Sequence, residues 1–266
     1  MGTYTVMDLP SEEDAYRAYR FLKSLEEKIS HFRENSEVSR INANAGVEAV
    51  EVSDIVLEVI KLSLEISEKT YGYFDISVGS VSINYRMKGV LSEEEARKLV
   101  NFRDILVEGD FVFLRKRGMA IDLGGIGKGF AVEKAYEYLG TERGFIGIAG
   151  DMKVWGEERV LGVKDPLSGT TLLQMINAED LCLSTSGNYV KDHISQRDKT
   201  LLQITVVHKN CAFADAYATA LLSMPPSLRE RFIKENPEVG VLELYRDGTL
   251  RMNRAFREFF KLILIK

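Results

Sequence analysis

A-I-D-L-G-G-I-G-K-G-F-A, residues 120–131, holds four glycines and one lysine within six consecutive positions. The apolar run at 119–123 predicts a strand before the glycines, and apolar residues at helical spacing over 131–139 predict a helix after them. A glycine turn between a strand and a helix directs backbone N–H groups and the positive end of the helix dipole toward an anion, usually phosphate. Lys128 adds a positive charge there, so the stretch favours a phosphate site.

Two common phosphate-binding loops do not match this stretch. A Walker loop that ended at Lys128 would need glycine at position 122 and serine or threonine at position 129, where the chain has Asp122 and Gly129. A dinucleotide-binding loop that began at Gly125 would need glycine where the chain has Phe130. A tight turn that uses glycine only for its positive φ stays open as the alternative.

Composition narrows the class of protein. The 266 residues are 45% hydrophobic and 28% charged, which is ordinary for a globular protein in water. The net charge of −5 and the lack of a Lys/Arg cluster argue against a nucleic-acid partner. No stretch is apolar enough to span a membrane, and the acidic segment 11–14 argues against a signal peptide. We therefore expect either a cytoplasmic protein or one whose export or anchoring segment is absent from this sequence.

The two cysteines, Cys182 and Cys211, lie far apart and without C-x-x-C spacing. This pattern indicates neither a zinc site nor a disulfide framework.

Five segments resemble, in chain order, the motifs of the FAD:protein FMN transferase (ApbE) family. The central one is D-L-G-G-I-G-K-G-F-A at 122–131, where the family usually has D-L-G-G-I-A-K-G-Y-A. The others are M-G-T at 1–3, F-D at 74–75, T-S-G at 185–187 and A-D-A-Y-A-T-A at 214–220. Because these segments span nearly the whole chain, a chance match of all five is not expected.

The predicted fold class is α+β, with mixed β-sheets and flanking helices, because strands and helices are interleaved without strict βαβ alternation. The resemblance implies an ApbE-like, T-fold-like architecture. We expect residues 1–266 to form a single flavin transferase domain, with two intimately packed subdomains as the alternative arrangement.

The resemblance also implies which residues form the site. The glycine-rich loop and the T-S-G segment would bind the diphosphate of FAD, while Mg²⁺ would bridge its phosphate oxygens. His193 would act as the catalytic base, with Asp215 as the alternate. The residues implied to bind FAD are Met1, Tyr73, Phe74, Asp75, Asp122, Gly124, Lys128, Thr185, Ser186 and Ile194; those implied to bind Mg²⁺ are Gly125 (through its backbone carbonyl), Asp215, Ala218 and Thr219.

The spacing of Asp215 and Thr219 gives the metal site some independent support. Residues four apart lie on one face of a helix, and a carboxylate with a hydroxyl beside a diphosphate suits a hard cation. Taken alone, a packed threonine and an aspartate near the start of the helix would be the simpler interpretation.

The resemblance predicts an Mg²⁺-dependent enzyme that splits FAD, releases AMP and attaches FMN through a phosphoester to a threonine. The partner would be a protein with a D-G-x-S-G-A-T-like segment. The resemblance also favours an extracytoplasmic location for this protein, either in the periplasm or anchored to a membrane by a segment absent from this sequence. Two alternatives stay open: an FAD pyrophosphatase that gives FMN and AMP, and a non-catalytic flavin-binding protein.

The chain departs from the family pattern after His193. The family continues H-x-x-D-P-x-[TS]-G, whereas this chain reads H-I-S-Q-R-D at 193–198. Three local expectations can also be tested: an open polar loop over 31–46, a hairpin formed by 154–156 with 159–163, and a turn at T-S-G.

Overall fold

The computed structural model describes residues 2–187 and 198–265. The chain divides into two compact units. The helical unit comprises Phe21–Gly127, and the sheet unit combines Gly2–Arg20 with the chain from Lys128 onward. Helix α1 (Glu12–Ile29) begins in the sheet unit and ends in the helical unit. Ser11 caps the start of this helix, because its hydroxyl accepts the Asp14 N–H.

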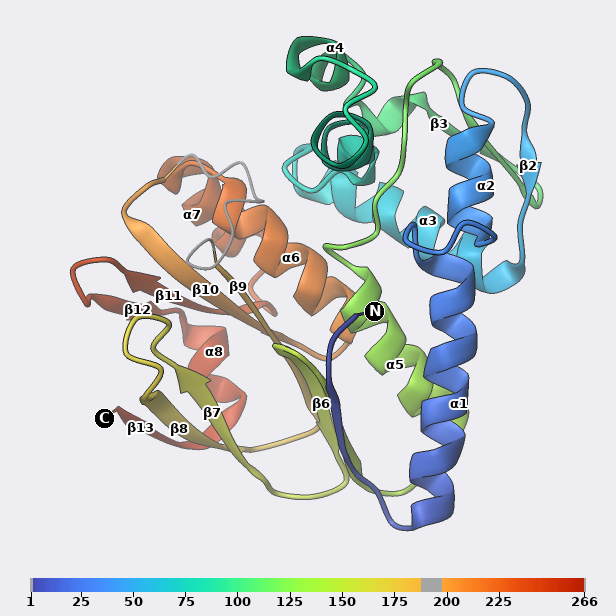
Figure 1. Cartoon of the computed structure of the whole chain (residues 1–266). Helices are drawn as coiled ribbons and strands as arrows, with labels where there is room; N and C mark the ends of the chain where they lie inside the picture. Colours follow the sequence, from blue (N-terminus) through green and yellow to red (C-terminus); the bar gives the residue numbers. More distant parts are fainter. Residues whose placement is uncertain (1, 188–197, 266) are drawn as a thin grey trace. The chain divides into compact units, whose positions relative to one another are not determined.

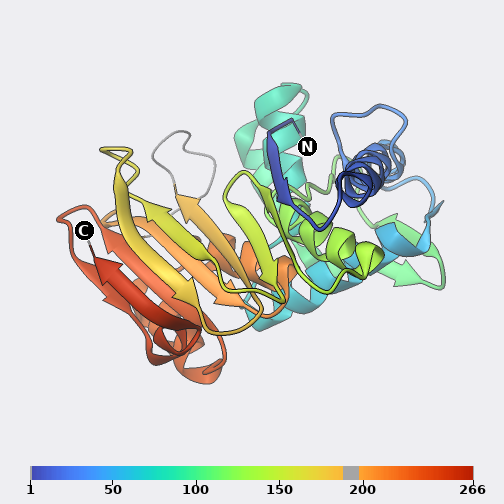
Figure 2. The same ribbon diagram turned by 90° about the horizontal axis from the view of Figure 1, so that it is seen from below.

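The sheet unit is built on a seven-stranded sheet in the order β1-β5-β6-β9-β10-β11-β12. A second sheet has the order β13-β8-β7, and every strand pair described is antiparallel. Figure 2 shows the strands of this unit side by side, from yellow-green to red, with the N-terminal strand in blue. The strands are β1 (Thr5–Asp8), β5 (Gly144–Ile148), β6 (Asp151–Trp155), β7 (Val160–Lys164), β8 (Thr171–Asn177), β9 (Leu181–Gly187), β10 (Leu201–His208), β11 (Gly240–Tyr245), β12 (Leu250–Met252) and β13 (Phe260–Ile265).

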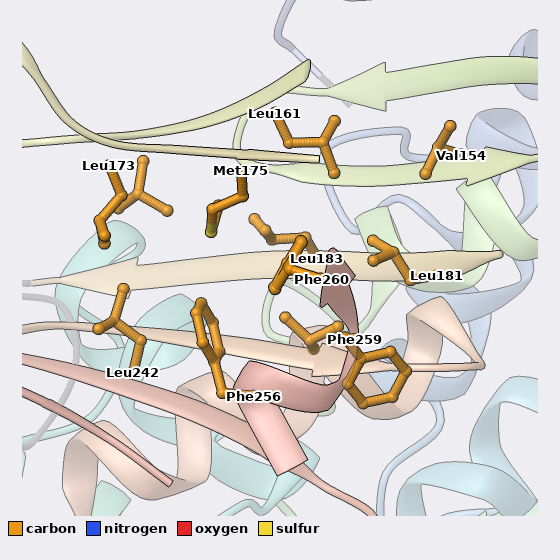
Figure 3. Packing of buried hydrophobic residues seen from close by; sticks show 12 residues of the cluster. Val154, Leu161, Leu173, Met175, Leu181, Leu183, Leu242, Phe256, Phe259 and Phe260 are labelled. Atoms are coloured by element: carbon orange, nitrogen blue, oxygen red, sulfur yellow. The ribbon is translucent and has the colours of Figure 1, made fainter. Parts of the chain in front are cut away.

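Helices and the smaller sheet cover the central strands of the large sheet on both faces. Helix α6 packs against β9 and β10 (Figure 1), and the opposite side holds an apolar cluster (Figure 3). That cluster joins β9 residues Leu181 and Leu183 to β8 residues Leu173 and Met175. Strand β10 is accordingly buried along almost its whole length. Besides the first half of α1, the helices of this unit are α5 (Gly127–Leu139, whose first residue belongs to the helical unit), α6 (Cys211–Ser223), α7 (Pro226–Glu235) and α8 (Arg254–Glu258).

The helical unit contains a small sheet in the order β2-β4-β3 with helices around it. Residues 105–114 of this unit form a hairpin that turns at Gly109, and Asp54–Lys69 form a long helix. The elements are α2 (Glu37–Ala43), β2 (Val50–Glu51), α3 (Asp54–Lys69), the 3₁₀ turn η1 (Ile76–Val78), the π-helix η2 (Ser80–Met87), α4 (Glu93–Lys98), η3 (Phe102–Asp104), β3 (Ile105–Glu108) and β4 (Phe111–Leu114). Together with the sheet unit, they make the fold α+β, as predicted.

The expected strand at 119–123 does not form. Its backbone is held by other partners: the Asn42 amide both accepts from the Ile121 N–H and donates to the Ile121 carbonyl. The Ser80 hydroxyl accepts the Ala120 N–H, and the Asp122 N–H donates to the Ile76 carbonyl. Because these groups replace a neighbouring strand, the apolar run is buried without being part of a sheet.

The three local expectations were wrong. The segment 31–46 contains α2, which Ser36 caps by accepting the Ser39 N–H. Segment 159–163 does not pair with 154–156, because β7 pairs with β8 in the smaller sheet while β6 pairs with β5 and β9. The T-S-G segment is the paired end of β9 rather than a turn. Among the residues that the structure describes, no helix is long and apolar enough to cross a membrane.

Candidate active site

Three charged side chains meet where α5, β6 and α6 of the sheet unit come together. The Lys128 ammonium lies 2.5 Å from an oxygen of Asp151 and 3.3 Å from both oxygens of Asp215. The two carboxylate side chains are 3% exposed, whereas Lys128 is 30% exposed. Two buried carboxylates therefore share one cation that can still be reached from solvent.

Backbone geometry places each member of this cluster. The Gly129 N–H donates to Asp215 at 2.9 Å, which fixes α6 against the first turn of α5. A Cβ on Gly129 would come within 2.1 Å of the Cys211 carbonyl oxygen, so only glycine permits this approach. Asp151 follows a two-residue turn in which Ala149 has a φ of 54°. The Ser184 hydroxyl donates a short hydrogen bond to Asp151.

The charges of the cluster influence one another. Burial, and then the negative charge of Asp151, raises the pKa of Asp215 to about 6, although Lys128 and the Gly129 N–H act in the opposite direction. Burial alone would lower the pKa of Lys128, but attraction to Asp151 and Asp215 outweighs it and raises that pKa. With both carboxylates ionised and one ammonium between them, the cluster has one excess negative charge.

The raised pKa of Asp215 predicts a dependence of stability on pH. Between the ordinary pKa of 3.8 and about 6, the folded protein binds more protons than the unfolded chain, so its free energy of unfolding falls as the pH rises. For metal-free protein, we expect ionisation of Asp215 to lower the free energy of unfolding by up to about 3 kcal/mol between about pH 4 and pH 7. The Asp215→Asn variant has no carboxyl group at this position, so its free energy of unfolding should not show this decrease with rising pH. Urea unfolding of both proteins in chelator measures the difference, and a difference independent of pH contradicts the expectation.

The other polar residues predicted for this site are half-buried. Thr185 and Ser186 are half-buried at the end of β9, and the Thr185 hydroxyl lies 2.9 Å from that of Thr205 on the adjacent strand. Thr219 is half-buried one turn after Asp215 in α6, and Ala218 beside it is buried. Asn210 is the N-cap of this helix, and its side chain accepts the Ala212 and Phe213 N–H groups. Asp215 is therefore not the N-cap.

A second polar cluster lies in the helical unit around Asp122. One carboxylate oxygen accepts the Ser82 hydroxyl at 2.6 Å, and the other accepts the Gly124 N–H at 2.8 Å. The Nδ1 atom of His31 lies 3.4 Å from Asp122, and the His31 ring packs 4.0 Å from that of Phe32. Asp122 is thus held in place at the start of the glycine turn. Gly125, which follows Gly124 in this turn, is half-buried.

The predicted flavin-contacting residues of the helical unit have structural roles of their own. Phe74 is 4% exposed and belongs to the core, while Tyr73 is half-buried. Asp75 accepts the Ser77 N–H and hydroxyl, and also the Phe102 N–H. Burial raises the pKa of Asp75 in spite of these donors. The flavin contacts of these three residues stay predictions. Met1, His193 and Ile194 lie outside the described residues.

Known proteins resemble this chain in sequence and in fold. A model of the ApbE family matches residues 1–242. The chain belongs to the ApbE family. A FAD:protein FMN transferase of Vibrio cholerae is 26% identical over 274 residues, which cover 90% of this chain and 80% of that protein. One from Klebsiella pneumoniae is 24% identical, covering 84% of this chain and 80% of that protein.

The same fold occurs in solved ApbE structures. The ApbE protein from Thermotoga maritima superposes with a TM-score of 0.85 and 24% identity, covering 98% of this chain and 97% of that one. The flavin transferase ApbE from Vibrio cholerae gives a TM-score of 0.83 at 23% identity, covering 97% and 96%. The ApbE fold expected from the sequence is therefore confirmed.

The sequence did not assign a role to Asp151, although this residue ends the I-A-G-D segment that stands where the ApbE family usually has N-x-G-G-D. The aspartate that the I-A-G-D segment shares with the family motif could have pointed to a role for Asp151. Only the fold shows that Asp151 is the nearest carboxylate to Lys128.

The expectation for the cysteines was wrong, because Cys182 and Cys211 form a disulfide with a Cα–Cα distance of 5.0 Å. Strand β9 carries the first cysteine and α6 begins at the second. They are 29 residues apart in sequence, and closing a loop of this length stabilises a protein by about 3–4 kcal/mol in the chain-entropy model.

Proposed function

We propose that this protein is an FAD:protein FMN transferase that releases AMP and attaches FMN to a threonine of an acceptor protein. The observation that carries the proposal is the Lys128–Asp151–Asp215 cluster in a chain of the ApbE family. A purely flavin-binding protein would not need a partly exposed ammonium held by two buried carboxylates. The names of the relatives from Vibrio cholerae and Klebsiella pneumoniae support the same activity.

The donor set of the cluster fits a magnesium ion. Asp215 and Thr219 offer oxygen ligands one helical turn apart, and the cluster has one excess negative charge for a cation to neutralise. The backbone of Gly125 and Ala218 completes the set that the family resemblance implies. When bound, Mg²⁺ would neutralise charge on the diphosphate of FAD.

In the reaction, the acceptor threonine oxygen attacks the phosphorus on the FMN side, the bond to the AMP phosphate breaks, and AMP leaves with the bridging oxygen. The Lys128 ammonium would stabilise the negative charge that develops on the phosphates, since it can approach them from its partly exposed position. Asp151 would hold Lys128 in place while Asp215 binds the cation. We assign removal of the threonine proton to His193.

The deciding experiment incubates the protein with FAD, Mg²⁺ and a peptide that contains D-G-x-S-G-A-T. A peptide heavier by the mass of FMN, together with an equal amount of AMP, is the expected result. AMP without a modified peptide would instead mean an FAD pyrophosphatase. Neither product, with FAD still bound, would mean a flavin-binding protein.

Lys128→Met should weaken the binding of FAD and strengthen the binding of Mg²⁺. The loss of a charge-assisted phosphate contact should weaken FAD binding about 5- to 150-fold, corresponding to about 1–3 kcal/mol. Since the ammonium no longer competes for Asp215, the half-saturating Mg²⁺ concentration should fall. Flavin fluorescence titrations at several Mg²⁺ concentrations measure both effects. Unchanged FAD affinity in a variant with a normal circular dichroism spectrum contradicts the phosphate role of Lys128.

We also assign the protein to an extracytoplasmic, oxidising compartment. The Cys182–Cys211 disulfide supports this assignment, because disulfides persist in such compartments and are rare in the reducing cytoplasm of most organisms. The thiol state of protein isolated from its native cells, trapped by alkylation before lysis, tests it. Two free thiols in the freshly trapped protein would contradict the assignment.

A further inference from the structure

The Cys182–Cys211 disulfide lies against a buried ion pair that has no role in the proposed reaction. Lys153 on β6 and Glu133 on α5 pair at 3.1 Å, and their side chains are 5% and 9% exposed. The Cys182 sulfur lies 3.5 Å from the Lys153 ammonium and 3.5 Å from a Glu133 oxygen. The same Glu133 oxygen accepts the Cys211 N–H at 2.8 Å. Four elements, α5, β6, β9 and α6, are thus joined at one point.

This point lies directly before the predicted metal-binding residues. Cys211 is the first residue of α6, and Asp215 follows one helical turn later. On the other side of the bond, Cys182 precedes Thr185 by three residues in β9. The disulfide therefore connects the helix that carries Asp215 and Thr219 to the strand that carries Thr185.

The start of α6 also contacts Gly129 of α5 in two ways, and both contacts depend on the position of the first turn of α6. The Gly129 N–H donates to Asp215, and the Gly129 Cα packs against the Cys211 carbonyl with no space for a side chain. A small displacement of the first turn of α6 would lengthen the first contact and move the Asp215 oxygens relative to Lys128. Metal affinity depends strongly on such orientation of the ligands.

The residues around the disulfide include three potential metal ligands that lie close together: Glu133, Cys182 and Cys211. The Lys153 ammonium argues against a second metal site there. It lies 3.1 Å from both Glu133 oxygens, 3.5 Å from the Cys182 sulfur and 3.1 Å from the Lys209 carbonyl. A cation is therefore already present among these groups, and the two sulfurs are bonded to each other.

We propose that the Cys182–Cys211 disulfide is a positioning element for the metal site: it fixes the first turn of α6 so that Asp215 and Thr219 bind Mg²⁺ with full affinity. This inference rests on the proposed function. Reduction by a dithiol or a phosphine breaks the S–S bond, gives two thiols and oxidises the reductant. It would weaken Mg²⁺ binding while leaving the chemical step intact once metal is saturating.

The test compares three proteins: the oxidised wild type, the wild type reduced with a phosphine, and Cys182→Ala/Cys211→Ala. Alkylation and mass measurement verify the thiol state. The readouts are AMP release as a function of Mg²⁺ concentration, Mn²⁺ binding by electron paramagnetic resonance with FAD present, and Tm. Met175→Ala is the matched control, because it removes buried side-chain volume from β8 in the apolar cluster and leaves α6 untouched.

We expect the half-saturating Mg²⁺ concentration and the Mn²⁺ dissociation constant to rise about 10-fold without the disulfide. The kcat at saturating metal should stay within about twofold, and reoxidation of the reduced wild type should restore the affinity. Met175→Ala should lower Tm without changing metal affinity. A lower Tm with unchanged metal affinity in the reduced protein would overturn the proposal, and so would loss of the folded spectrum, since the bond would then only stabilise the fold.

Failure of the proposed function gives a different pattern. If the oxidised wild type releases no AMP, the transferase and pyrophosphatase assignments both fail. Mn²⁺ binding in the oxidised and reduced proteins then still decides whether the disulfide controls metal affinity.

Discussion

Asp215→Asn is expected to reduce transfer of FMN at least 10³-fold while the protein stays folded. The amide keeps the shape of the side chain but removes the charge that would hold a cation, and such charge stabilisation is worth several kcal/mol in metal-dependent reactions. The buried position of Asp215 supports a large effect, because its oxygens contact Lys128 and the Gly129 N–H inside the protein rather than solvent. The measurement is AMP release and peptide flavinylation over a range of Mg²⁺ concentrations.

Two controls make this result interpretable. Asp110→Asn changes an exposed carboxylate in the turn between β3 and β4, so it should leave the rate unchanged. Excess chelator should abolish the activity of the wild type, and added Mg²⁺ should restore it. Wild-type activity in chelator, or near-normal turnover by Asp215→Asn, would remove the metal from the mechanism.

Gly129→Ala is expected to cause the largest loss of stability in the glycine-rich loop. The new Cβ would lie 2.1 Å from the Cys211 carbonyl oxygen and 2.7 Å from the Asp215 Cβ, so α5 and α6 must separate. Overpacking of this kind costs about 3 kcal/mol, which corresponds to a Tm decrease of roughly 6–12 °C in a chain of this size. Differential scanning calorimetry measures the change, and activity should fall with it as the Gly129 N–H moves away from Asp215.

Gly127→Ala is the matched control two residues earlier in the same helix. A Cβ at Gly127 would meet only the Ile29 and Leu123 side chains, at an ordinary contact distance of 3.8 Å. Alanine also favours a helix over glycine, and the ApbE family usually has alanine there. We expect a Tm equal to or above that of the wild type. Equal losses in both variants would mean that the crossing of α5 and α6 is less tight than the structure shows.

The predictable parts of this protein were those controlled by local sequence. The N-terminal turn of α1 follows from a serine that caps the helix, and α5 follows from apolar residues at helical spacing. The family motifs led to Lys128 and Asp215, which the structure brings together. Each of these features depends on residues close in sequence or on a motif with a known chemical role.

The predictions that were wrong concern features that depend on contacts between residues distant in sequence. The run at 119–123 looked like a strand, but Asn42 and Ser80 take its hydrogen bonds, and no local pattern indicates that. The disulfide follows from the pairing of β9 with β10, because Cys182 lies opposite His208, only three residues before Cys211. A correct hairpin register would have placed the two cysteines side by side, whereas their spacing alone could not.

The discontinuous sheet unit has a consequence for the order in which the chain folds during synthesis. Strand β1 pairs with β5 through Thr5↔Ile148 to Asp8↔Phe145, and the whole helical unit lies between them in sequence. A ribosome adding 5–20 residues per second would expose β1 for about 7–27 s before its partner strand emerges. The helical unit can fold in that interval, but β1 stays an unpaired strand edge, which is open to wrong pairing or chaperone binding. Slow elongation through 21–127 should therefore lower the yield of folded protein.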